Sequence, residues 1–169
     1  KQVTAALCAF SVFLVDGLDP EQATAIEVFV PQRYSAMIDR PVGPNVNVSS
    51  FGNTRYQFGL AAYHPESLFD SARASRVEDP RLDALMDKVT IKVDEALEIH
   101  MPRLWPARVE VTTEAGKMEK TVIAAPGDPD RRFDTTAVTE KFHSVADRLI
   151  GKTEADDWIA ATGGALTDC

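Results

Sequence analysis

The chain has 169 residues, of which 44% are hydrophobic and 26% charged, a composition typical of a folded globular protein. Its formal net charge of -8 disfavours binding to phosphate backbones and anionic lipid surfaces, so we expect neither a nucleic acid nor a membrane partner. The longest apolar run, Val3 to Val15, is interrupted by Thr4 and Ser11 and is shorter than the roughly 20 residues of a bilayer-spanning helix. We therefore expect this run to be a buried helix.

The two cysteines indicate a reducing compartment. Cys8 and Cys169 lie at opposite ends of the chain, and Cys8 falls on an apolar helical face, where a free thiol behaves as a small hydrophobic group. We accordingly expect a cytoplasmic protein. Because the chain begins with Lys1 in place of Met and enters a helix almost at once, we expect it to be a fragment of a longer protein.

The first part of the chain predicts a helix, a strand, a long loop and a second helix. A stripe of apolar residues at helical spacing predicts a first helix that ends at Asp16 and Gly17. Asp19 and Pro20 then predict a single helical turn. Residues 26–30 alternate as a strand closed by Pro31, and the turn formers of residues 41–53 predict the longest loop. A short helix is expected over 54–63, stopped by Pro65, after which a second short helix is possible. The residues of the first stripe are Val3, Leu7, Phe10 and Leu14.

The second part predicts a helix, a strand, a hairpin and two closing helices. Asp79 and Pro80 open the helix, residues 91–93 switch to the period of a strand, and residues 108–124 form a hairpin turning at Ala115 and Gly116. Asp134 caps a long helix that ends at Gly151, and a shorter helix around Trp158 ends at Gly163. The apolar stripe of the long helix is Val138, Phe142, Val145 and Leu149.

This order of elements predicts an α+β fold, in which helices cover a small, largely antiparallel sheet. The sequence lacks the regular alternation of strands and helices of a doubly wound fold. It also has no glycine-rich phosphate-binding motif after a strand, so nucleotide binding is unsupported. The histidines, His64, His100 and His143, have no second ligand at metal-site spacing. We predict neither a metal nor a cofactor.

Two loops carry candidate chemistry. Asp128, Asp130 and Asp134 suggest a calcium loop, but the residues between them do not fit that pattern, and we favour a polar loop that caps the next helix. The residues that flank the long loop gather cations and hydrogen-bond donors suited to a carboxylate ligand: Arg40, Arg55, Tyr56 and Gln57. The alternative, that these arginines are ordinary surface residues, is equally supported.

Several segments, in their order along the chain, resemble the end of MmgE/PrpD family proteins. The run that starts at Gly17 and leads into the strand with Ile26, Glu27 and Val28 is similar to the opening of that region. The segment from Asp79 to Leu82 and the hairpin from Arg108 match in order and spacing, and a turn of Gly127, Asp128 and Pro129 precedes a helix that carries Lys141 and Phe142. The resemblance reaches from the start of the chain to about Gly151.

The resemblance implies the lid domain of a two-domain enzyme. Residues 1–151 would form the α/β lid and residues 152–169 a C-terminal helical extension. The partners implied are an N-terminal helical domain of the same protein, a small polycarboxylate substrate and a second copy in a homodimer. The implied reactions are lyase or isomerase reactions such as 2-methylcitrate dehydration, cis-aconitate decarboxylation or iminodisuccinate epimerisation, which move a proton next to a carboxylate-bearing carbon.

One departure from the family pattern affects the expected site. Leu60 stands where a family tyrosine implicated in the active site would fall, and leucine cannot transfer a proton. We therefore name Tyr56 as the candidate catalytic residue, with Lys1, Arg55 and Gln57 as candidate substrate-binding residues. The alternative is a non-catalytic ligand-binding or dimerisation module derived from the family.

Overall fold

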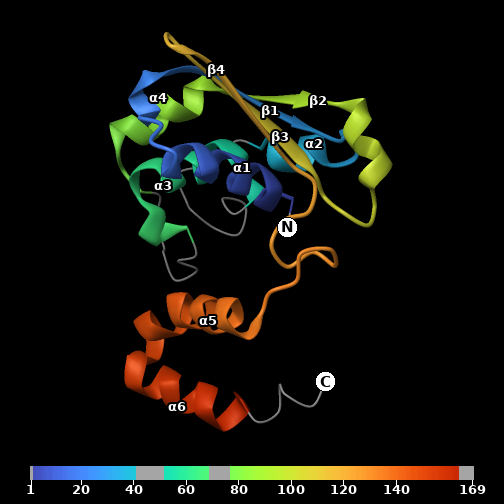
Figure 1. The fold of residues 1–169 in the computed structure, drawn as a ribbon. Coiled ribbons are helices and arrows are strands. Elements are labelled where there is room, and N and C mark those ends of the chain that lie inside the picture. Colours follow the sequence, from blue (N-terminus) through green and yellow to red (C-terminus); the bar gives the residue numbers. More distant parts are fainter. Residues whose placement is uncertain (1, 41–51, 69–76, 164–169) are drawn as a thin grey trace. The chain divides into compact units, whose positions relative to one another are not determined.

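The computed structural model describes residues 2–40, 52–68 and 77–163. The chain forms two compact units, Lys1–Arg131 and Arg132–Cys169. The first unit contains a sheet and its helices, and the second contains helices α5 (Thr135–Ile150) and α6 (Lys152–Gly163) (Figure 1). The boundary between the units lies earlier in the chain than Gly151, the end predicted for the lid.

The first unit begins with the predicted helix and strand. Helix α1 (Thr4–Val15) is followed by a 3-10 turn, Pro20–Gln22. The backbone amide of Glu21 in this turn donates to the Asp19 carboxylate at 3.0 Å. Strand β1 (Ala23–Val30) starts earlier than expected, and helix α2 (Gln32–Ile38) was not expected at all. The sequence signal for α2 was weak: two apolar residues four positions apart, Tyr34 and Ile38, which the structure buries.

The elements after residues 41–51 agree with the sequence prediction, except that strand β2 starts two residues earlier than expected. Helix α3 (Thr54–Tyr63) ends before a 3-10 turn at Pro65–Ser67, and helix α4 (Pro80–Lys88) leads directly into strand β2 (Val89–Val93). Asp79 caps α4, as predicted, by accepting a hydrogen bond from the Arg81 amide at 2.9 Å. Of the predicted loop over residues 41–53, positions 41–51 lie outside the described residues.

The sheet has four strands in the order β2-β1-β3-β4. Strands β3 (Ala107–Thr113) and β4 (Gly116–Val122) form the predicted hairpin, and β3 also pairs antiparallel with β1. Only β1 and β2 run parallel, with Ile26 opposite Val89. The expected α+β class with a largely antiparallel sheet is thus confirmed.

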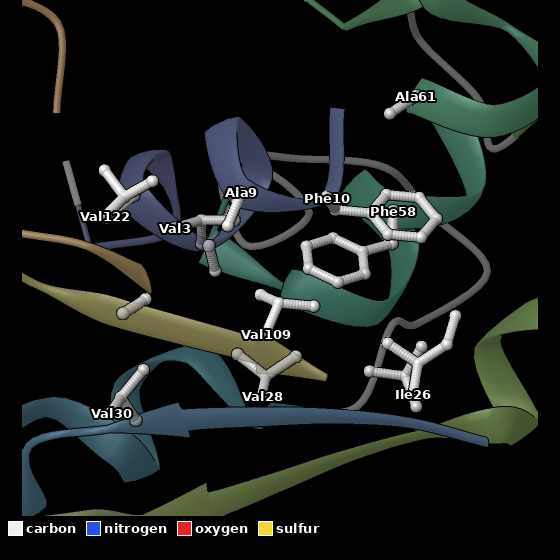
Figure 2. Packing of buried hydrophobic residues seen from close by; sticks show 14 of the residues in the cluster. Val3, Ala9, Phe10, Ile26, Val28, Val30, Phe58, Ala61, Val109 and Val122 are labelled. Carbon is white, nitrogen blue, oxygen red and sulfur yellow. The ribbon is translucent and has the colours of Figure 1, made fainter. Parts of the chain in front are cut away.

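One face of the sheet carries the core. Ile26, Val28 and Val109 are fully buried and point toward α1 and α3 (Figure 2). Above them the rings of Phe10 on α1 and Phe58 on α3 stack in parallel, with centroids 4.4 Å apart and planes inclined by 4°. Each large side chain buried in this way contributes about 1.5–3 kcal/mol, so this layer supplies much of the folding free energy.

Helix α3 lies so close to α4 that a side chain cannot fit between them at Gly59. A β-carbon placed on Gly59 would lie 2.5 Å from Leu82 Cγ and 3.4 Å from the Leu82 carbonyl oxygen. Leu82 is itself fully buried with Tyr56 and Leu60, which leaves it little room to move. Gly59 is therefore required for the packing of the two helices.

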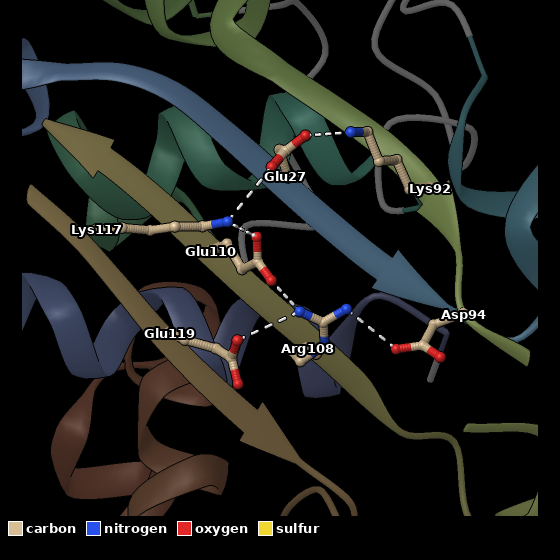
Figure 3. Close-up of polar contacts among 7 residues, drawn as sticks. All are labelled: Glu27, Lys92, Asp94, Arg108, Glu110, Lys117 and Glu119. Atoms are coloured by element: carbon tan, nitrogen blue, oxygen red, sulfur yellow. Dashed lines mark hydrogen bonds and ion pairs between the residues drawn. The ribbon is translucent and has the colours of Figure 1, made fainter. Parts of the chain in front are cut away.

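The opposite face of the sheet carries a network of charged side chains (Figure 3). Glu110 at its centre is buried and pairs with Lys117 and Arg108. Arg108 also contacts Asp94 at 3.1 Å and Glu119 at 3.3 Å, and its guanidinium lies 3.8 Å from the centre of a phenylalanine ring. That ring belongs to Phe29, and the remaining members of the network are Glu27 and Lys92.

The network lowers the pKa of Glu110. The hydrogen bond from Lys117 is the largest cause, and the charge of Arg108 acts in the same direction, against the opposing effect of burial. A carboxylate whose pKa is lowered by folding stabilises the fold above its unfolded value, and this contribution is lost as the pH falls through the folded pKa. Glu110 therefore stabilises the sheet at neutral pH and ceases to do so in acid.

The second unit consists of two helices. The Ala137 amide donates to the Asp134 carboxylate at 2.8 Å, which confirms the predicted cap of α5, and Gly151 ends the helix with a φ of +81°. The apolar stripe of α5 is exposed, with the side chain of Leu149 at 65%. Within the described part of the chain, no helix is long and apolar enough to cross a membrane.

We predict that Gly59→Ala destabilises the first unit by about 1–2 kcal/mol. A 2.5 Å contact with a buried side chain places the overpacking cost in the upper part of the usual range, at about 2–3 kcal/mol, and the better helix propensity of alanine, worth about 1 kcal/mol, offsets part of it. The measurement is urea unfolding followed by circular dichroism. Gly52→Ala is the matched control, because the nearest atom to its new β-carbon, the Met37 carbonyl oxygen, lies at 3.7 Å. An unchanged or raised stability of Gly59→Ala would contradict the close approach.

We predict that Glu110→Gln lowers the free energy of unfolding by about 1–3 kcal/mol at neutral pH, because the buried group at this position loses its charged contacts with Arg108 and Lys117. The difference from the wild type should shrink as the pH falls from 4.5, the usual value for this group, through the lower pKa of Glu110 in the folded protein, where the wild-type carboxylate becomes protonated. Urea unfolding across this pH range tests both statements. The exposed Glu119→Gln is the control, and a pH-independent difference for Glu110→Gln would refute the assignment.

Candidate functional site at the start of helix α3

The start of α3 is held in place by Asn53. Its side-chain oxygen accepts a hydrogen bond from the Tyr56 amide at 2.8 Å, and its side-chain nitrogen donates to the Arg40 carbonyl. Asn53 is 1% exposed, so both contacts are shielded from water. One side chain thus caps the helix and also holds the backbone at Arg40.

Thr54, the first residue of α3, carries an unpaired hydroxyl. Its side chain is fully buried, and its Oγ1 is the one buried side-chain polar atom without a hydrogen-bond partner within the described ranges. A buried hydroxyl that lacks a partner costs about 1–3 kcal/mol. The threonine therefore destabilises the fold relative to an apolar residue of the same shape.

Arg55 connects three elements. Its Nε and Nη2 donate to Asp39 Oδ1, after the end of α2, at 3.1 and 2.6 Å, and its Nη1 donates to the Val89 carbonyl, at the start of β2, at 2.6 Å. The side chain is 32% exposed. The guanidinium is therefore held in one orientation while part of it faces solvent.

Tyr56 and Gln57 point into the protein. Tyr56 is fully buried against Leu60 and Leu82, and its hydroxyl accepts a hydrogen bond from the Val77 amide at 3.1 Å. Gln57 is 4% exposed. Leu60, in the place of the expected family tyrosine, is likewise fully buried and offers no polar group.

The structure brings together some of the predicted site residues. Arg55, Tyr56 and Gln57 occupy the first turn of α3, but only Arg55 has substantial exposure; Lys1 lies outside the described residues. The sequence prediction missed the roles of Asn53 and Thr54. An asparagine before a helix was a recognisable capping signal, whereas nothing in the sequence distinguished Thr54 from a threonine with a partner.

The first turn of α3 has the elements of an anion-binding surface. The helix dipole favours a negative charge near the start of a helix, and the partly exposed guanidinium of Arg55 adds a geometry that matches a carboxylate. The face of the sheet shown in Figure 3 is less suited, because its four carboxylates outnumber its three cations. The geometry therefore favours the start of α3 as the place for an acidic ligand.

A second polar cluster lies at the other end of α3. His64 Nε2 lies 2.8 Å from Asp79 Oδ2, and the Arg81 guanidinium binds the same carboxylate at 2.8 Å. The hydrogen bonds from Arg81 and His64 hold the pKa of Asp79 far below its usual value. Because Asp79 also caps α4, this cluster joins the end of α3 to the start of α4 and is structural.

The unpaired hydroxyl of Thr54 leads to a stability prediction. Thr54→Val should leave the free energy of unfolding unchanged or raise it by up to about 1 kcal/mol, because a buried polar group without a partner is removed and the shape is kept. Thermal and urea unfolding measure the change. Thr54→Ala is the comparison, since it removes the hydroxyl and also leaves a cavity, and it should be the less stable of the two variants. A loss above about 1 kcal/mol in Thr54→Val would show that the hydroxyl is bonded.

Comparison with known proteins identifies the family. The family model described as the MmgE/PrpD C-terminal domain matches residues 3–163, which is nearly the whole chain. No curated protein matches the sequence. The match extends beyond Gly151 and so includes most of the segment predicted to be an extension. The chain therefore belongs to the MmgE/PrpD family, and residues 3–163 are its C-terminal domain.

Proposed function

We propose that this chain is the lid of a lyase or isomerase that acts on a small di- or tricarboxylic acid, as a 2-methylcitrate dehydratase does. The observation that carries the proposal is the family match over residues 3–163. In this class of reaction the enzyme abstracts a proton from a carbon next to a carboxylate, and a lid assists by orienting the substrate and excluding water. An N-terminal helical domain would form the other wall of the cleft, in a homodimeric protein.

Arg55 is the residue of this lid that we assign to substrate binding. A guanidinium has five N–H groups, and three of them make the bonds to Asp39 and Val89. A substrate carboxylate can therefore bind the exposed side of Arg55 without breaking these contacts. Because the guanidinium is already held in place, little conformational entropy is lost when the substrate binds.

Tyr56 is a less direct candidate for proton transfer. Its hydroxyl is bonded to the Val77 amide inside the protein, so the bond must break before the group can reach a substrate. Gln57 is also buried, and Lys1 stays a candidate from the sequence alone. We therefore propose that the lid chiefly binds the substrate and closes the cleft, and that the main acid and base groups lie in the rest of the protein.

The second candidate is a non-catalytic ligand-binding or dimerisation module. The observation in its favour is that Leu60 and Tyr56, the positions expected to act in proton transfer, are both fully buried. Assays of the complete protein with 2-methylcitrate, cis-aconitate and iminodisuccinate distinguish the two. Turnover of any of them supports the enzyme, whereas carboxylate binding without turnover supports the module.

We predict that Arg55→Ala in the complete protein weakens substrate binding by about 2 kcal/mol, because a charge-assisted contact to a carboxylate is lost. The measurement is isothermal titration with the substrate or a non-reacting dicarboxylate. Asp39→Asn is the matched control, since it weakens the structural contact of Arg55 but retains the cation. Equal affinity losses in the two variants would assign Arg55 a structural role only.

A further inference from the structure

His143 on α5 lies between two carboxylates in the second unit. Its Nδ1 is 2.8 Å from Asp147 Oδ1, one turn further along the same helix, and its Nε2 is 3.3 Å from Asp156 Oδ1 on α6. Asp156 is held in turn by Lys152, whose Nζ lies 3.0 Å from both carboxylate oxygens. The charged groups against His143 are thus Asp147 on its own helix and Asp156, with Lys152 behind it, on α6.

Only a protonated ring can present an N–H to both carboxylates. A neutral imidazole has one N–H, so only one of its nitrogens can donate, and the other presents a lone pair to a negative oxygen. The imidazolium ion donates from both nitrogens. The shorter contact, to Asp147, is the one expected to keep the proton, and the contact from α5 to α6 then becomes repulsive.

Apolar packing between α5 and α6 is limited among the described residues, since Ile159 on α6 is only partly buried. The buried side chains of this unit are Ala146 and Ala155, which bury a small apolar area, whereas Leu149 and Trp158 are more than half exposed. A single ion pair between two weakly packed helices can therefore change how firmly they associate, even though an exposed pair is worth only a few tenths of a kcal/mol to about 1 kcal/mol in general.

We propose that His143 makes the α5–α6 hairpin pH-sensitive: its protonated ring fastens α6 to α5, and loss of the proton releases α6. Contacts made only by the charged form of a histidine stabilise the closed hairpin at low pH and are lost as the pH rises. Aspartates are charged above about pH 4, and histidine is the side chain whose charge most often changes near neutral pH, so measurements on both sides of neutrality compare the two states.

Amide hydrogen exchange on the 169-residue chain at about pH 5.5 and pH 8 tests the proposal. After correction for the intrinsic pH dependence of exchange, protection of the α6 amides should fall about threefold at the higher pH, which is the size of one exposed ion pair. The amides of α1 and α3 serve as an internal reference and should not show this change. Absence of any α6-specific pH effect in the wild type overturns the proposal.

Two variants of α6 with the same change in charge locate the effect. Asp156→Asn removes the carboxylate that faces His143 and should abolish the pH dependence, whereas Asp157→Asn, at the next position, should retain it. His143→Gln should abolish it as well. A pH dependence that persists in Asp156→Asn, or that is lost equally in Asp157→Asn, would show that the general charge of α6 is responsible and would overturn the assignment.

Discussion

The close approach of α3 to α4 at Gly59 determines where the candidate binding residue lies. α3 is held on one side by the stack of Phe58 on Phe10 and on the other by Leu82, which touches the helix where a side chain is missing. α4 leads without a loop into β2, so the distance between α3 and the first residue of β2 is set by the same contact. Arg55 is therefore within reach of the Val89 carbonyl because α3 and α4 are in direct contact.

The two faces of the sheet have different roles, because successive side chains of a strand point to opposite faces. Ile26, Val28 and Val109 point to one side and exclude water beneath α1 and α3, while Glu27 and Glu110 point to the other. On that second face every lysine or arginine shown in Figure 3 contacts at least one carboxylate. Its four carboxylates outnumber its three cations, so this face is less suited to an acidic ligand than the start of α3, where Arg55 is partly exposed.

Membership of the MmgE/PrpD family identifies the kind of domain but not its chemistry. The described residues offer a positioned guanidinium at Arg55 and a capped helix start, which are means of binding. They place Tyr56 and Leu60 in the interior, where neither contacts solvent. In the proposed enzyme this division assigns substrate orientation to the lid and proton transfer chiefly to groups outside it.

The sequence alone determined the elements whose signals are local. The alternating strand of residues 26–30, the hairpin turning at Gly116 and the caps at Asp79 and Asp134 were all recognisable, because a turn or a cap depends on residues a few positions apart. The order of these elements also sufficed for the fold class and for the resemblance to the family. Helix α2 was missed because it is short and its two buried residues, Tyr34 and Ile38, make a weak periodic signal.

Only the tertiary structure decided which side chains of the first turn of α3 are exposed. Residues 54–57 are all polar, or partly so, and periodicity cannot tell which of them faces the core when a helix is covered on two sides. The structure buries Thr54, Tyr56 and Gln57 and exposes part of Arg55, because α1 and α4 cover most of this helix. The pairing of Arg55 with Asp39 and of His143 with Asp156 depends equally on contacts between separate helices, which local sequence patterns do not encode.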